Sequence, residues 1–144
     1  MEESLRQEER RQFLPCLTSE EAGNYSPLVL AFAGDAVYEL AVRTMLVQKN
    51  RARPHELNKV KAKLVNAGAQ SAMMETLREF LTDEEMAVYR RGRNAKTDSV
   101  AKHASVGDYR RATGFECLMG YLFLSGRKER LIELIDIGLE SIGM

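Results

Sequence analysis

Residues 28–38 read LVLAFAGDAVY, an apolar run that carries a single charged residue, Asp35. Ser26 and Pro27 precede the run, and a serine cap followed by proline in the first turn is typical of a helix start. The apolar pattern continues beyond this stretch, and Gly34 is the one weak helix former within it. We therefore expect a long helix that faces a core and contains a lone carboxylate.

Further segments have apolar residues at helical spacing, together with their own start signals. The first of these expected helices begins at Pro54, and the apolar pattern resumes after a possible break at residues 66–68. The later ones cover residues 83–91, a segment that begins near Ser105, and a last segment around residues 131–139. Thr82 and Glu85 form a capping box for the helix over 83–91. No strand-like alternation and no internal repeat occurs in the sequence. The predicted fold class is therefore all-α.

The chain has 144 residues, 44% of them hydrophobic and 29% charged, which is ordinary for one globular domain. Glutamate and arginine dominate residues 1–25, so we expect a mobile or loosely docked acidic leader there and a globular domain over residues 26–144. The formal net charge is zero. Any contact with nucleic acid must therefore come from local clusters of lysine and arginine.

The two cysteines, Cys16 and Cys117, are too few for a disulfide framework or a cysteine-rich zinc site. The acidic N-terminus does not resemble a targeting peptide, and no apolar stretch is long enough to cross a membrane. These features predict a cytoplasmic location. The aromatic residues at helical spacing are expected in the core or at a dimer interface, and they are Tyr38, Phe115, Tyr121 and Phe123.

A second carboxylate, Glu116, also interrupts an apolar run, far along the chain from Asp35. An isolated buried carboxylate costs several kcal/mol unless it is paired, protonated or bound to a cation. If the two helices pack together, both acids can share one divalent cation, and magnesium or manganese there suits phosphodiester hydrolysis. The alternative is that either acid forms a structural ion pair, with Arg43, Arg110 or Arg111, or lies at a helix edge in water.

Two segments resemble motifs of the ribonuclease III family. Residues 32–37, FAGDAV, resemble its signature helix, and residues 112–124, ATGFECLMGYLFL, resemble its closing acidic helix. Residues 63–66, KLVN, and residues 89–96, YRRGRNAK, narrow the resemblance to the Mini branch, whose members lack the double-stranded-RNA-binding domain. The resemblance covers roughly residues 26–140.

This resemblance implies an all-helical, homodimeric endoribonuclease that cuts double-stranded RNA and matures the 23S ribosomal RNA precursor. Asp35 and Glu116 are then the catalytic residues and the ligands of Mg2+, for which Mn2+ can substitute. A ribosomal protein that presents the substrate is a further expected partner. The sequence departs from the larger family at Ala31 and Thr113, where acidic residues usually stand. Glu39, one turn after Asp35, is a candidate for holding a metal-bound water.

Basic residues concentrate between positions 90 and 111, a segment that contains seven lysine and arginine residues and only two acidic residues. Such a run is usually only a solvated face, but with the resemblance we expect it to contact RNA phosphates. The expected RNA-binding residues are Lys59, Lys63, Arg90, Arg91, Arg93, Asn94 and Lys96. The rival hypothesis, motivated by Ala31 and Thr113, is a catalytically silent domain that binds structured RNA or ribosomal particles.

Overall fold

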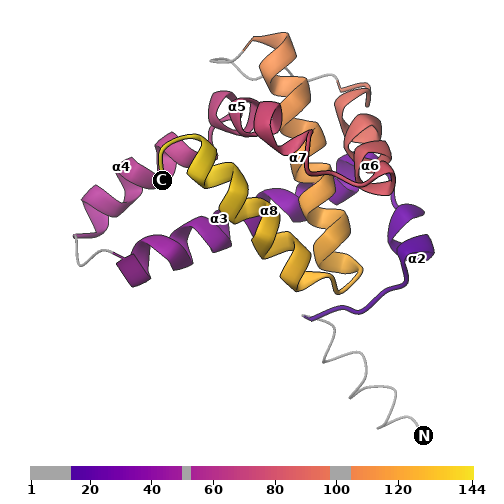
Figure 1. Cartoon of the computed structure of the whole chain (residues 1–144), viewed down its shortest axis with the longest axis horizontal. Coiled ribbons are helices and arrows are strands. Elements are labelled where there is room, and N and C mark those ends of the chain that lie inside the picture. The colour runs from indigo at the N-terminus through magenta and orange to yellow at the C-terminus, as the bar shows by residue number, and fades with distance from the viewer. Residues whose placement is uncertain (1–13, 50–52, 98–104) are drawn as a thin grey trace, which may run out of the picture.

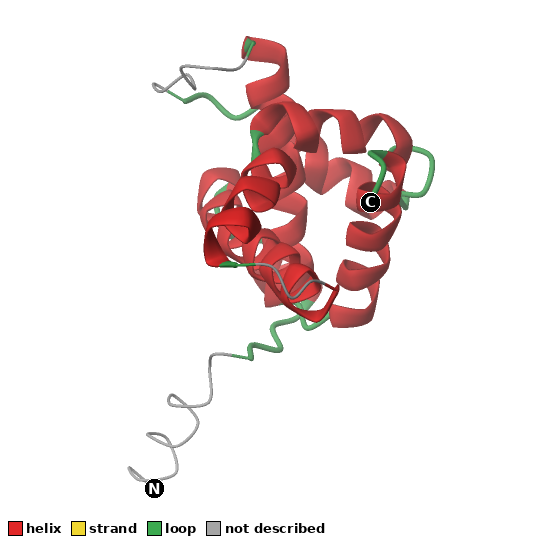
Figure 2. Cartoon of the chain, turned by 90° about the vertical axis from the view of Figure 1, so that its left-hand side faces the viewer, coloured by secondary structure: helices red, strands yellow, loops and turns green. Residues whose placement is uncertain are grey.

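The structure, a computed structural model, describes residues 14–49, 53–97 and 105–144. These residues form helices connected by short loops and contain no strand, which confirms the all-α prediction (Figure 2). The helices are α2 (Ser19–Gly23), α3 (Pro27–Lys49), α4 (Pro54–Val65), α5 (Ala67–Leu77), α6 (Asp83–Arg93), α7 (Val106–Leu124) and α8 (Lys128–Ser141). None of these described helices has the length and apolar character needed to cross a lipid bilayer.

Helix α7 is the centre of the fold, and α3, α5, α6 and α8 pack around it (Figure 1). Because α7 has neighbours on several sides, its buried residues include almost the whole stretch from Ala112 to Leu122. Glu116 is the charged residue within that stretch. Helix α4 contacts α3 and α5 instead, and lies at the edge of the molecule.

Side-chain caps begin α3, α5, α6 and α7, and those of Ser26, Thr82 and Ser105 were predicted from the sequence, whereas Asn66 was expected only to break or bend a helix. In each case a side-chain oxygen accepts a hydrogen bond of 2.8–3.2 Å from the main-chain N–H three residues later, which satisfies a free donor of the first turn. The capping residues are Ser26, Asn66, Thr82 and Ser105. Helix α6 ends at Arg93, two residues beyond the prediction, because Gly92 is packed against α7.

The predicted aromatic core is confirmed. Tyr38 and Phe115 are fully buried and meet edge to face, with ring centroids 5.0 Å apart. The Tyr38 hydroxyl donates a hydrogen bond of 2.7 Å to the carbonyl oxygen of Leu64, so its polar end is satisfied inside the core. Tyr121 is also buried, and Phe123 is partly buried against the same cluster.

Part of the predicted acidic leader packs on the helical domain. The Leu17 N–H donates a 3.0 Å hydrogen bond to the carbonyl of Leu124, at the end of α7. Arg127 donates to the Ser19 hydroxyl and lies 5.5 Å from the centre of the Tyr121 ring. The short helix α2 is thereby attached to the end of α7. The domain boundary at residue 25 stays a prediction.

Candidate active site

The candidate site lies where α3 and α7 cross with their backbones in contact. A Cβ atom added to Gly34 would lie 1.7 Å from the carbonyl oxygen of Glu116, and one added to Gly120 would lie 1.9 Å from that of Leu30. No side chain fits at either position, so only glycine permits this approach. Asp35 follows Gly34 directly, and the crossing therefore carries its carboxylate to Glu116.

The carboxylate of Asp35 lies close enough to that of Glu116 to form a hydrogen bond with it and to influence its pKa. Burial raises the pKa of Glu116 to about 8, and the negative charge of Asp35 and a hydrogen bond between the two side chains add to that rise. Two adjacent acids in such a position resist simultaneous ionisation. A divalent cation between them relieves that repulsion, which makes the pair a natural cation site.

The expectation that Asp35 faces the core is wrong. Asp35 is exposed, whereas Glu116 is half-buried on the other side of the pair. The reason is that the apolar run of α3 is not buried on all sides: Phe32 is 83% exposed and Leu40 is 59% exposed. In the single chain the carboxylate pair is therefore open to solvent at Asp35.

The alternative of structural ion pairs is not what the described residues form. Arg43 pairs with Glu39 at 3.1 Å, and Arg111 pairs with Asp108 at 3.0 Å. Neither Asp35 nor Glu116 takes part in an ion pair with a described residue of opposite charge. Among the described residues, no basic side chain therefore neutralises the two acids.

The donor set fits a hard divalent cation. Within residues 14–49, 53–97 and 105–144, no third acidic, histidine or cysteine side chain joins the pair. Ala31 and Thr113 are buried, and the Thr113 hydroxyl donates to the carbonyl of Tyr109 at 2.9 Å. Two carboxylates can hold a magnesium-type ion because such ions retain water at their remaining positions or take substrate phosphates there.

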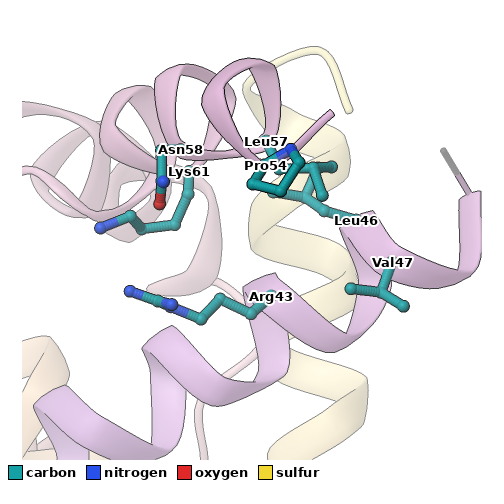
Figure 3. A pocket seen from close by; sticks show the side chains of 7 residues that line it. All are labelled: Arg43, Leu46, Val47, Pro54, Leu57, Asn58 and Lys61. Carbon is teal, nitrogen blue, oxygen red and sulfur yellow. The ribbon is translucent and has the colours of Figure 1, made fainter. Parts of the chain in front are cut away.

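Glu39 is occupied by basic side chains. Its carboxylate binds Arg43 at 3.1 Å and Lys61 of α4 at 3.6 Å. A hollow of about 220 Å³ lies between α3 and α4, with Leu46 and Leu57 among its apolar walls. In Figure 3 the side chains of Arg43 on α3 and Lys61 on α4 extend toward the same side of this hollow. A water-mediated role for Glu39 stays a prediction. Lys61, which the sequence analysis missed, is the lysine that joins α4 to α3.

The expected RNA-binding residues of α6 and the following loop fall into three groups. Arg90 and Arg93 line one hollow, while Asn94 and Lys96 line another beside Arg110. Arg91 points elsewhere, because its guanidinium donates to the carbonyls of Gly23 and Tyr25 at 3.0 and 3.3 Å. Arg91 therefore fixes the segment between α2 and α3.

Lys59 and Lys63 do not extend the basic surface of α6. Both are exposed on α4, and Figure 1 shows α4 and α6 at opposite sides of the molecule. The sequence alone does not show how α4 is oriented, so it could not separate these lysines from the arginines of α6. Arg78, which joins Arg90 and Arg93 from the end of α5, was not among the expected RNA-binding residues. Lys102 and His103 lie outside the described residues.

Comparison with known proteins identifies the family. The Ribonuclease III domain matches residues 28–127, which include both acids and the glycine crossing. The Mini-ribonuclease 3 of Brevibacillus brevis is 49% identical over 77% of this chain and 83% of the relative. That of Enterococcus faecalis is 47% identical over 81% of this chain and 89% of the relative. The chain belongs to the Mini-ribonuclease 3 family.

A solved structure agrees with this family membership. A crystal structure of a protein from Fusobacterium nucleatum superimposes with a TM-score of 0.74 at 31% sequence identity, covering 83% of this chain and 95% of that one. As a member of this family, the chain is an endoribonuclease specific for double-stranded RNA. Ribonuclease III family members generally depend on a divalent metal. Among the described residues, the carboxylate pair offers two oxygen donors of the kind that such an ion binds.

Proposed function

We propose that Asp35 and Glu116 form the metal-dependent catalytic centre and that magnesium is the physiological ion. The observation that supports this most directly is the Gly34–Gly120 crossing, which brings two distant acids together, neither of them in an ion pair with a basic residue that the structure describes. A divalent cation held there supplies Lewis-acid chemistry, because it polarises the phosphodiester and lowers the pKa of water. Manganese, which accepts the same oxygen donors, serves in its place.

The two acids have different surroundings and therefore different tasks. Glu116 is half-buried on the central helix, so its carboxylate is anchored and excludes bulk water from one side of the site. Asp35 is exposed on α3 and faces the side from which RNA approaches. Both must be ionised to bind the cation, and proton loss from Glu116 accompanies binding.

We propose a homodimer that uses the exposed apolar face of α3. Phe32, Leu40 and Val47 are each more than half exposed on this helix, and Leu28 and Val29 extend the same side. Contiguous apolar surface of this kind marks protein contacts in water-soluble folds. A dimer with two copies of the carboxylate pair matches a duplex substrate, since each pair can cut one strand.

The proposed physiological substrate is the precursor of 23S ribosomal RNA, cut in the cytoplasm, with a ribosomal protein presenting it. Basic side chains from α4, α6 and the following loop contact its phosphates, and they read A-form shape more than sequence. End mapping of 23S precursors in cells that lack the protein tests this role. Restoration of mature ends by the wild type, but not by an Asp35→Asn variant, supports it. Normal ends without the protein would refute it.

The test of the catalytic centre is cleavage of a labelled RNA duplex with titrated magnesium or manganese. Asp35→Asn and Glu116→Gln should each lose at least about a hundredfold in rate, as expected when a metal ligand is removed. Asp136→Asn and Glu129→Gln make the same chemical changes at exposed positions of α8 and should cleave normally. Duplex binding without cleavage by the wild type at every metal concentration would instead establish the catalytically silent domain.

A further inference from the structure

A second concave basic site lies where α5, α6 and α7 meet. It is a hollow of about 260 Å³, and four arginines from the three helices line it against a single glutamate, Glu75. The arginines are Arg78 at the end of α5, Arg90 and Arg93 on α6, and Arg111 on α7. Four guanidinium groups around one small hollow create a strongly positive potential.

The floor of this hollow is rigid. Tyr89 is buried, and its ring packs so tightly on α7 that a Cβ atom on Gly114 would lie 2.7 Å from the ring. Arg93 lies over the same ring, with its guanidinium carbon 5.7 Å from the ring centre. Burial raises the pKa of Tyr89, whereas the charges of Arg93, Arg111 and Arg78 oppose that rise. Three guanidinium groups are thus near one phenol.

One arginine is fixed in place before any ligand arrives. The Nε of Arg111 donates to the Ser71 hydroxyl at 2.6 Å, and one terminal nitrogen donates to Asp108 at 3.0 Å. The other terminal nitrogen is not used by these two bonds. A guanidinium held in this way loses little conformational freedom when it binds a ligand, which favours a specific contact.

The other arginines have donors to spare. Arg78 and Arg90 form no ion pair with a carboxylate in the described parts of the chain, and both are exposed at the rim. Planar guanidinium groups bind phosphate through paired N–H donors more effectively than they bind water. A small hollow with several such donors suits a single phosphoryl group with two negative charges.

We propose that the Arg78, Arg90, Arg93 and Arg111 hollow is a binding site for a single phosphate group with two negative charges, separate from the Asp35–Glu116 pair. Two sources offer this chemistry: the 5′-phosphate at the end of an RNA strand, and free inorganic phosphate. The first source rests on the proposed function, because cleavage that leaves 5′-phosphates produces such ends. The site itself requires neither metal nor cleavage.

The experiment measures binding to the full chain in EDTA, so that RNA is not cut. Inorganic phosphate, compared with chloride at equal ionic strength, should raise the melting temperature of the wild type. An Arg78→Gln, Arg90→Gln double variant should weaken phosphate binding by at least about tenfold, because two charged donors are lost. Lys128→Gln removes a charge at the opposite end of the α7–α8 pair and should bind phosphate like the wild type.

The source is distinguished with two RNA duplexes that differ only in a 5′-phosphate or 5′-hydroxyl end. Tighter binding of the phosphorylated duplex by the wild type, lost in the double variant, assigns the site to RNA ends. Equal binding of both duplexes, together with the phosphate-induced stabilisation, assigns it to free phosphate. The proposal is overturned if phosphate raises the melting temperatures of the wild type and the double variant equally. It is also overturned if phosphate changes neither melting temperature and the double variant binds both duplexes more weakly by the same factor. Neither outcome bears on the catalytic centre, which is tested by metal-dependent cleavage.

Discussion

Gly34 and Gly120 occupy one reciprocal backbone contact between α3 and α7. A Cβ atom on Gly34 would lie 2.7 Å from the main-chain nitrogen of Gly120, and a Cβ atom on Gly120 would lie 3.1 Å from that of Gly34. The contact involves main-chain atoms, which cannot rotate away as a side chain can. The distance between the two candidate metal ligands therefore depends on the absence of two methyl groups.

Gly34→Ala or Gly120→Ala should force the helices apart and reduce both stability and cleavage. Overpacking of this kind costs about 1–3 kcal/mol, and the crossing should be at the upper end because backbone must move. We expect cleavage to fall at least about a hundredfold, since small displacements of catalytic groups have large effects. Urea unfolding and duplex cleavage measure the two losses.

The control is Gly23→Ala in α2, where an added Cβ atom meets nothing within 4 Å. This variant should have the stability and activity of the wild type or a slightly higher stability, because alanine restricts the unfolded chain. Full activity in Gly34→Ala would contradict the importance of the crossing.

Glu116 should make the stability of the metal-free protein depend on pH. Its folded pKa of about 8 lies above the ordinary value of 4.5, so the folded state holds a proton that the unfolded state releases between these values. The associated stability is present below about pH 4.5 and is lost as pH rises through 8. Glu116→Gln lacks this loss and should be more stable than the wild type at pH 8.5 by about 2 kcal/mol, allowing for the open side of the site.

Urea unfolding in EDTA at pH 5.5 and pH 8.5 measures this difference, with Glu129→Gln as the exposed control. The free energy of unfolding of Glu116→Gln relative to the wild type should increase with pH, whereas that of Glu129→Gln relative to the wild type should not. Saturating magnesium should reduce the advantage at pH 8.5, because the cation stabilises the ionised wild type. An advantage that is the same at both pH values would rule out the raised pKa.

The Arg130–Glu85 pair should contribute strongly to stability. Glu85 is 2% exposed, and Arg130 donates to its two oxygens at 2.9 and 2.8 Å. Burial alone raises the pKa of Glu85, but the hydrogen bonds from Arg130 and Thr82 outweigh it and hold that pKa below its usual value. Its stabilisation is therefore present above the ordinary pKa and is lost as pH falls below it.

Arg130→Gln leaves a buried carboxylate with fewer partners and should lower the free energy of unfolding by about 2–4 kcal/mol at neutral pH. The matched control is Arg43→Gln, which breaks an exposed pair and should cost less than about 1 kcal/mol. Chemical denaturation at pH 7 and pH 4 measures both. The cost of Arg130→Gln should shrink at pH 4, and equal costs for the two variants would show that burial of the pair is unimportant.

Phe32→Asp should dissociate the proposed homodimer. Phe32 is 83% exposed within an apolar face of α3, and aromatic residues at the centre of an interface commonly supply much of its affinity. We expect the dimer dissociation constant to rise about thirtyfold or more, measured by sedimentation equilibrium. Ile132→Asp, at an exposed apolar position of α8, is the control and should leave the association unchanged. A monomeric wild type would remove the dimer from the proposed function.

Local signals in the sequence determined most of the helical pattern. Serine, threonine and asparagine caps act on the N–H groups of their own first turn, so they can be read without any knowledge of the tertiary structure. The starts of α3, α6 and α7 followed from them, whereas the cap at Asn66 that begins α5 was not predicted. The two acids were also found in this way, because a charge within an apolar run is anomalous whatever surrounds it.

The tertiary structure alone decided which side of each helix is covered and what reaches across. Asp35 proved exposed because no described helix covers that side of α3, and a periodic pattern cannot show where neighbours are missing. Lys59 and Arg90 lie apart, whereas Arg78 and Arg111 meet, since these arrangements depend on how α4 to α7 are oriented. Gly34, a weak helix former by sequence, is required by a partner helix some eighty residues away. Contacts between distant residues depend on packing geometry, which local sequence does not contain.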